Sequence, residues 1–76
     1  MSDVLIVLRV LDRGRLERRP VDVDRLVALS GLTVGRAGRV LAVLSSLDWA
    51  CRVDGGWLAS DRGLAVLAGL EVLACA

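Results

Sequence analysis

The segment DRLVALSGLTVGRAGRVLAVL, residues 24–44, contains the pattern from which the fold is predicted. A glycine, Gly31, separates two runs in which apolar residues recur at helical spacing. Glycine at such a point permits the left-handed backbone that commonly ends a helix. Thr33 follows as a suitable N-cap for the second run. The segment therefore predicts two helices, residues 23–30 and 34 to about 47, joined by a tight turn.

The spacing around this turn predicts how the two helices pack. Val27 lies four positions before Gly31, and Leu32 follows the glycine as the buried apolar residue of the turn. Ala37 and Val40 then fall on the inner face of the second helix. Two helices that cross at a steep angle need a slender residue at their contact, a glycine in the turn and an apolar plug. The segment is therefore expected to form a helix-turn-helix.

The residues before the helix-turn-helix predict a first helix and a short extended piece. Ser2 or Asp3 can cap a helix of about residues 3–13, which Gly14 is expected to end. Pro20 and Val21 favour an extended segment, because proline tolerates the edge or start of a strand. Asp22 is expected to cap the helix of residues 23–30.

The residues after it predict a β-hairpin and a last helix. Two short runs, residues 49–53 and 57–60, are separated by Asp54-Gly55-Gly56, a strong hairpin signal. Asp61 is expected to cap a final helix of about residues 62–75. Trp49 should close the core beneath the hairpin. Trp57 either packs over the hairpin and the preceding helix or is exposed as a stacking platform.

Composition bounds the class of protein. The chain has 76 residues and is 55% apolar, which leaves room for a single domain, residues 1–76, and excludes disorder. The apolar runs are too short to span a bilayer, so no membrane partner is expected. The two cysteines, Cys51 and Cys75, should be reduced core thiols, and we expect a cytoplasmic protein.

The absence of histidine bounds the chemistry. Without an imidazole the chain has no ordinary general base for a serine or cysteine nucleophile, and two cysteines alone do not make a structural zinc site. We therefore expect no enzyme activity, no catalytic residues, no metal and no cofactor. A chain this short is also not expected to enclose a ligand pocket.

The order helix, short strand, helix, helix, two-stranded hairpin, helix resembles the winged helix-turn-helix superfamily. Among its members the chain is similar to small dimeric bacterial and archaeal transcriptional regulators. It is also similar to winged-helix modules that end larger proteins, such as the DNA processing protein A family. The resemblance implies a mainly α fold with a small β-hairpin, of the α+β class.

The resemblance to the regulators implies that the third helix enters the major groove of double-stranded DNA. The residues expected to contact DNA are Thr33, Arg36 and Arg39 near the bases, and Arg18, Arg19 and Arg52 at the phosphates. The alternative is that Arg36 and Arg39 only solvate an outer helix face. Asp54 at the hairpin tip and the acids Asp22 and Asp24 oppose DNA binding.

The first and last helices are apolar around most of their circumference, which predicts a partner surface. Terminal helices commonly pair across the dimer axis in the regulators that the chain resembles, so a homodimer is expected. Its interface residues would be Val4, Leu5, Leu8, Leu64, Leu67, Leu70, Val72 and Leu73. The alternative is a larger protein partner that covers the same surface, in which case the chain is an interaction module that never touches DNA.

Overall fold

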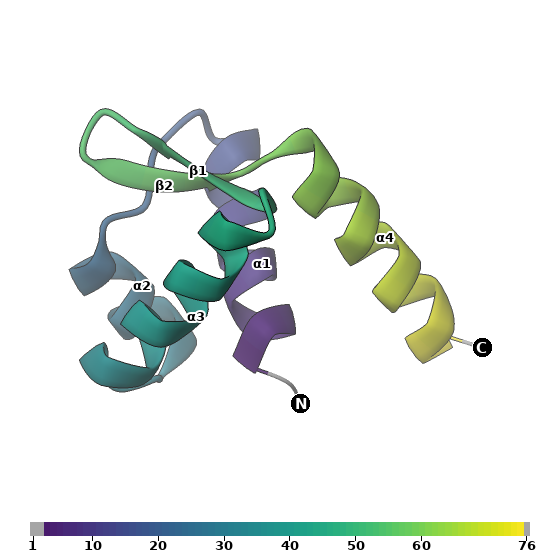
Figure 1. Ribbon diagram of the computed structural model, residues 1–76, viewed down its shortest axis with the longest axis horizontal. Helices are drawn as coiled ribbons and strands as arrows, with labels where there is room; N and C mark the ends of the chain where they lie inside the picture. The colour runs from purple at the N-terminus through teal and green to yellow at the C-terminus, as the bar shows by residue number, and fades with distance from the viewer. Residues whose placement is uncertain (1–2, 76) are drawn as a thin grey trace.

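The computed structural model describes the backbone of residues 3–75 and the side chains in that range other than those of residues 71 and 73–75. Its elements are α1 (Asp3–Leu16), α2 (Val23–Ser30), α3 (Val34–Ser46), β1 (Ala50–Val53), β2 (Gly56–Ala59) and α4 (Asp61–Cys75) (Figure 1). The molecule measures 35 × 23 × 23 Å. The expected α+β class, four helices with one two-stranded antiparallel hairpin, is confirmed.

The turn between α2 and α3 forms as its local sequence predicts. The Asp22 side chain accepts a hydrogen bond from the Arg25 backbone N–H at 2.7 Å, and Thr33 Oγ1 accepts one from the Arg36 N–H at 3.2 Å. Gly31 ends α2 in the left-handed conformation, with φ 75°. The chain direction changes by 109° between the two helices. Both predicted caps and the steep crossing are therefore present.

Val21, in the extended segment before α2, forms one antiparallel bridge with the hairpin. In the hairpin Ala50 lies opposite Ala59 and Arg52 opposite Trp57, and the turn residues Asp54 and Gly55 both have positive φ. Val21 donates to the Trp57 carbonyl at 2.9 Å and accepts from the Trp57 N–H at 2.8 Å. The predicted extended residue thus pairs with the outer side of β2.

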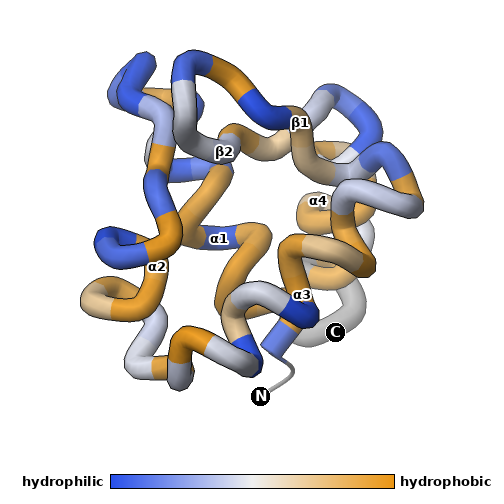
Figure 2. Tube along the Cα trace, turned by 60° about the vertical axis from the view of Figure 1, so that its left-hand side comes forward, coloured by the Kyte–Doolittle hydropathy of each residue, from blue (hydrophilic) through white to orange (hydrophobic). Residues whose placement is uncertain are grey.

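The core is aliphatic and centres on α1. Val7, Leu8 and Leu11 of α1 have no exposed surface, and they meet buried side chains of α2, α3, both strands and α4. Figure 2 shows the hydrophobic stretches of α1 and α3 side by side in the interior. Trp49 packs half-buried against this core, as expected. The apolar circumference of α1 is therefore largely covered by the chain itself.

Gly14 does not end the first helix, which continues to Leu16. The glycine is buried, and a Cβ added there would lie 2.6 Å from Val21 Cγ2 and 2.9 Å from the Arg19 carbonyl oxygen. Its role is to let the returning chain pass close to α1. The left-handed residue that follows the helix is Arg18, with φ 55°.

Three smaller expectations are also corrected. Ser60, not Asp61, caps α4, because its Oγ accepts from the Gly63 N–H at 3.0 Å. The second helix of the predicted pair ends at Ser46, one residue earlier than expected, and Leu47 is its exposed C-cap. Cys51 is an exposed strand residue rather than a core thiol, and the side chain of Cys75 lies outside the described residues.

Within residues 3–75 no single helix has the length and apolar character needed to cross a membrane. Only α2 and α3 taken together, across their 109° bend, meet those two criteria.

Candidate nucleic-acid interface

The outer face of α3 is open to solvent along its whole length. Ala37, Val40, Leu41 and Leu44 form the buried face, and every other residue from Val34 to Ser46 is exposed. The exposed face carries Arg36 and Arg39 among small residues, Gly35, Gly38, Ala42 and Ser45. A helix with such short side chains can approach another surface closely.

The fold places Arg36 and Arg39 in different electrostatic surroundings. Arg36 forms an ion pair with Asp3 of α1, with 2.7 Å between Nη2 and Oδ2. Arg39 is exposed and pairs with no acid in the part of the chain that the structure describes. The sequence around α3 contains no acid before Asp48, so Asp3 could not be anticipated as a partner. Thr33 is exposed, with its hydroxyl oxygen engaged as the α3 cap.

An open groove of about 590 Å³ separates α3 from the hairpin. Its lining residues are Val23, Gly38, Leu41, Ala42, Ser45, Ser46, Arg52 and Trp57. The Arg52 guanidinium lies over the Trp57 ring, 5.8 Å from its centroid, a cation–π geometry that orients the cation. The groove therefore brings a guanidinium of β1 and the Ser45 hydroxyl to the outer face of α3, whereas the Ser46 hydroxyl donates to the Val43 carbonyl at 2.9 Å. Guanidinium and hydroxyl groups are typical phosphate ligands. Trp57 is half-buried in this lining rather than a bare stacking platform.

Arg18 and Arg19 are not brought to this groove. Both are exposed on the connector that follows α1, whereas Arg36 pairs with the first turn of that helix. A 14-residue helix is about 21 Å long, so α1 separates these cations from the start of α3. The predicted cations thus divide into Arg36, Arg39 and Arg52 around α3 and a separate pair on the connector.

Acidic side chains surround the groove at three points. Asp22 precedes Val23, Asp48 follows the end of α3, and Asp54 occupies the hairpin tip; all three are exposed. The carboxylate of Asp54 therefore repels anions from the hairpin tip. Any contact with phosphates on this face depends on α3 and Arg52.

The predicted dimer residues divide by burial. Leu8 and Leu67 are 0% and 4% exposed in the core of their own chain, so they are removed from the predicted interface. Val4, Leu5 and Leu64 are partly buried against the same core. Leu70 and Val72 are exposed on the half of α4 that projects from the body (Figure 1), and the side chain of Leu73 lies outside the described residues. Among the predicted interface residues whose side chains are described, the exposed ones therefore lie on α4.

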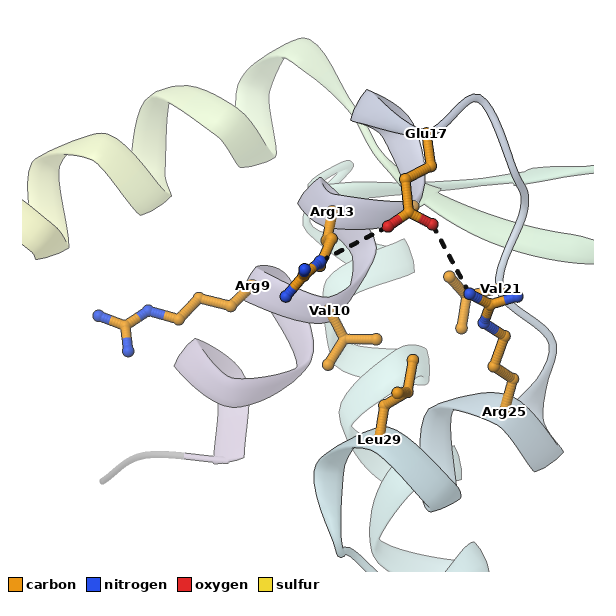
Figure 3. Close-up of a pocket in the computed structure, with 8 residues that line it drawn as sticks. Arg9, Val10, Arg13, Glu17, Val21, Arg25 and Leu29 are labelled. Atoms are coloured by element: carbon orange, nitrogen blue, oxygen red, sulfur yellow. Dashed lines mark ion pairs between the residues drawn. The ribbon is translucent and has the colours of Figure 1, made fainter.

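A second pocket, between α1 and α2, was not expected from the sequence. It has a volume of about 500 Å³ and shares no lining residue with the α3 groove. Arg9 and Arg13 of α1 and Glu17, the first residue after this helix, recur at four-residue spacing, and Arg25 comes from α2 (Figure 3). The four-residue spacing indicates that Arg9, Arg13 and Glu17 share one side of the first segment. The contribution of α2 to the pocket depends on tertiary packing, which the sequence does not indicate.

No family model, curated protein or solved structure matches this chain. Its function is therefore inferred from its own residues.

Proposed function

We propose that this chain is a winged-helix protein that binds double-stranded DNA through α3 and acts as a cytoplasmic, homodimeric transcriptional regulator. The observation that carries the proposal is the presentation of α3. A three-residue turn and a 109° change of direction leave its entire outer face open, with Arg36 and Arg39 exposed on it. This is the geometry with which helix-turn-helix proteins insert a recognition helix into the major groove.

The side chains on α3 suit contact with base edges. The first turns of a recognition helix point into the groove, and here they carry Thr33, Arg36 and Arg39. A bidentate arginine contact with guanine O6 and N7 contributes about 1–3 kcal/mol of discrimination. Gly38 and Ala42 lie beside these arginines and leave room for the helix to sit deep in the groove.

The groove between α3 and the hairpin supports a backbone contact. Arg52 is held over Trp57 at its edge, and Ser45 adds a hydroxyl group. Phosphate contacts of this kind set the register of a protein on the duplex without reading sequence. The acid at Asp54 assigns this role to the groove rather than to the hairpin tip.

The salt dependence of DNA affinity tests the proposal. At about −0.9 per neutralised phosphate, three cations per subunit predict a slope of log Kobs against log salt of about −2.7 for one subunit and about −5.4 for the homodimer. The measurement is fluorescence anisotropy with a pool of random duplexes at three salt concentrations. Undetectable binding at the lowest salt would overturn the proposal.

A double variant locates the interface. Arg36→Ala with Arg39→Ala should weaken binding by at least about tenfold, because two charge-assisted contacts are lost. The matched control is Arg62→Ala, an exposed arginine on α4. If the control loses as much affinity as the double variant, the affinity for DNA depends only on net charge, and α3 is not the helix that contacts the bases.

A second candidate function is a winged-helix interaction module that docks on a larger protein partner. The exposed Leu70 and Val72 on α4 and the acidic hairpin tip favour it. The two candidates separate on the DNA titration, since an interaction module shows no salt-dependent affinity for duplexes.

A further inference from the structure

The pocket between α1 and α2 has the size and lining of a ligand site. Its volume of about 500 Å³ lies within the range of about 300–1,000 Å³ that is usual for small-molecule pockets. None of its lining residues belongs to α3 or to the lining of the α3 groove. A ligand bound there would leave the outer face of α3 accessible.

The floor of the pocket is apolar. Val10 of α1, Val21 of the extended segment and Leu29 of α2 line it. In Figure 3 Val10 and Leu29 point toward one another from the two helices. Leu29 is 58% exposed, so much of this large aliphatic side chain in the pocket lining is in contact with water. An apolar group placed over Leu29 and Val10 would remove this surface from water.

The rim of the pocket is cationic and holds an internal carboxylate. Glu17 lies between Arg13 and Arg25, as the dashed lines in Figure 3 show. Arg13 Nε is 3.5 Å from Oε1, and Arg25 Nη2 is 3.7 Å from Oε2. Charge-assisted hydrogen bonds have lengths of about 2.7–2.9 Å, so both pairs are loose. A carboxylate that forms shorter bonds to the two guanidiniums can therefore displace Glu17 from between them.

The arginines on the rim outnumber the acid. Arg9, Arg13 and Arg25 line the pocket together with Glu17 alone among the acids. Arg9 extends away from the Glu17 carboxylate in Figure 3, so Arg13 and Arg25 define the anion position. A planar guanidinium fork matches a carboxylate in shape and charge.

We propose that this pocket binds a small organic monocarboxylate with an apolar tail. The carboxylate takes the place of Glu17 between Arg13 and Arg25, and the tail covers Val10 and Leu29. The assignment is independent of DNA binding, because it depends only on the residues that line the pocket.

The test uses octanoate as the probe, with octanol as its uncharged counterpart and acetate as its tail-less counterpart. Each is titrated into the ¹⁵N-labelled chain while backbone amide shifts are followed. Octanoate should give saturable shifts in α1 and α2 around the pocket. Octanol and acetate should bind at least about tenfold more weakly, because octanol lacks the carboxylate and acetate lacks the apolar tail. Equal affinity for octanol and octanoate, or shifts centred on α4, would overturn the proposal.

Two substitutions with opposite expected effects identify the anion position. Arg25→Gln should weaken octanoate binding, and Glu17→Gln should strengthen it, because the competing internal carboxylate is removed. Arg62→Gln on α4 is the matched control and should change neither. If Arg25→Gln does not fold, Arg13→Gln gives the same test, since the Arg13 side chain is 82% exposed. Weaker binding to the Glu17→Gln variant contradicts the proposed displacement.

Discussion

Arg36 of α3 and Asp3 of α1 form an ion pair, with 2.7 Å between Nη2 and Oδ2. The pair links the first turn of α1 to the helix proposed to read DNA. It also neutralises one of the two arginines on the exposed face of that helix. Binding of Arg36 to a base or phosphate therefore requires this cation to leave Asp3, and the acid competes with DNA for it.

The Asp3→Asn substitution should strengthen DNA binding. The Arg36 side chain of this pair is mostly solvent-exposed, and exposed ion pairs contribute about 0.2–1 kcal/mol, so the expected gain in affinity is about 1.4- to 5-fold at low salt. Asp12→Asn is the control, because it makes the same charge change on the same helix at a residue with no ion pair to any described residue. Fluorescence anisotropy at one salt concentration compares the two. An equal gain for both variants would mean that the effect is one of net charge alone.

Gly14→Ala should destabilise the fold even though alanine favours helices. The added Cβ would meet Val21 Cγ2 at 2.6 Å and the Arg19 carbonyl at 2.9 Å, and overpacking of this kind costs about 1–3 kcal/mol. Gly69→Ala is the matched control, since Gly69 is also helical and a Cβ there meets nothing within 4 Å. That variant should gain up to about 1 kcal/mol. Urea unfolding measures both, and a stabilised Gly14→Ala variant would contradict the close approach.

The features that could be predicted from the sequence are those set by neighbouring residues. The caps Asp22 and Thr33 and the left-handed Gly31 depend on hydrogen bonds and backbone angles within a few positions. Gly14 was misjudged because a glycine needed for close packing has the same local sequence as one that ends a helix. Its partners, Val21 and Arg19, reach it only after the chain turns back.

The parts of the candidate sites that could not be predicted depend on tertiary contacts. The pairing of Asp3 with Arg36 and of Glu17 with Arg25 joins residues from different helices. The first helix is apolar on most faces, and this pattern does not distinguish a surface for a partner chain from one covered by the same chain. The structure buries Leu8 in the chain's own core and packs Val4 and Leu5 partly buried against it.

Arg15→Met should cost more stability than Asp61→Asn, although the two residues form an ion pair. Arg15 Nη2 lies 2.5 Å from Asp61 Oδ1, and Nη1 also donates to the Ala59 carbonyl at 3.3 Å. The Asp61 side chain is almost fully exposed. Water therefore screens its attraction to Arg15, and loss of its charge should change the free energy of unfolding little. Loss of the half-buried arginine also removes the bond to β2, for an expected cost of about 0.5–1.5 kcal/mol. Urea unfolding measures the loss of stability in both variants. A larger loss for Asp61→Asn would contradict the stabilising role given to the bond between Arg15 and the Ala59 carbonyl.

Val72→Lys should convert the proposed homodimer into a monomer. Val72 is 68% exposed about three helical turns beyond Asp61, on the projecting half of α4, so the substitution leaves the core intact. Leu16→Lys is the control, because Leu16 is 77% exposed at the end of α1 where α4 begins. Sedimentation equilibrium at micromolar concentration should show a dimer for the parent chain and the control, and a monomer for Val72→Lys. DNA affinity should fall when the dimer is lost, because a dimer binds two half-sites with its α3 helices about 34 Å apart. A monomeric parent chain would contradict the homodimer and leave the exposed face of α4 to a larger protein partner.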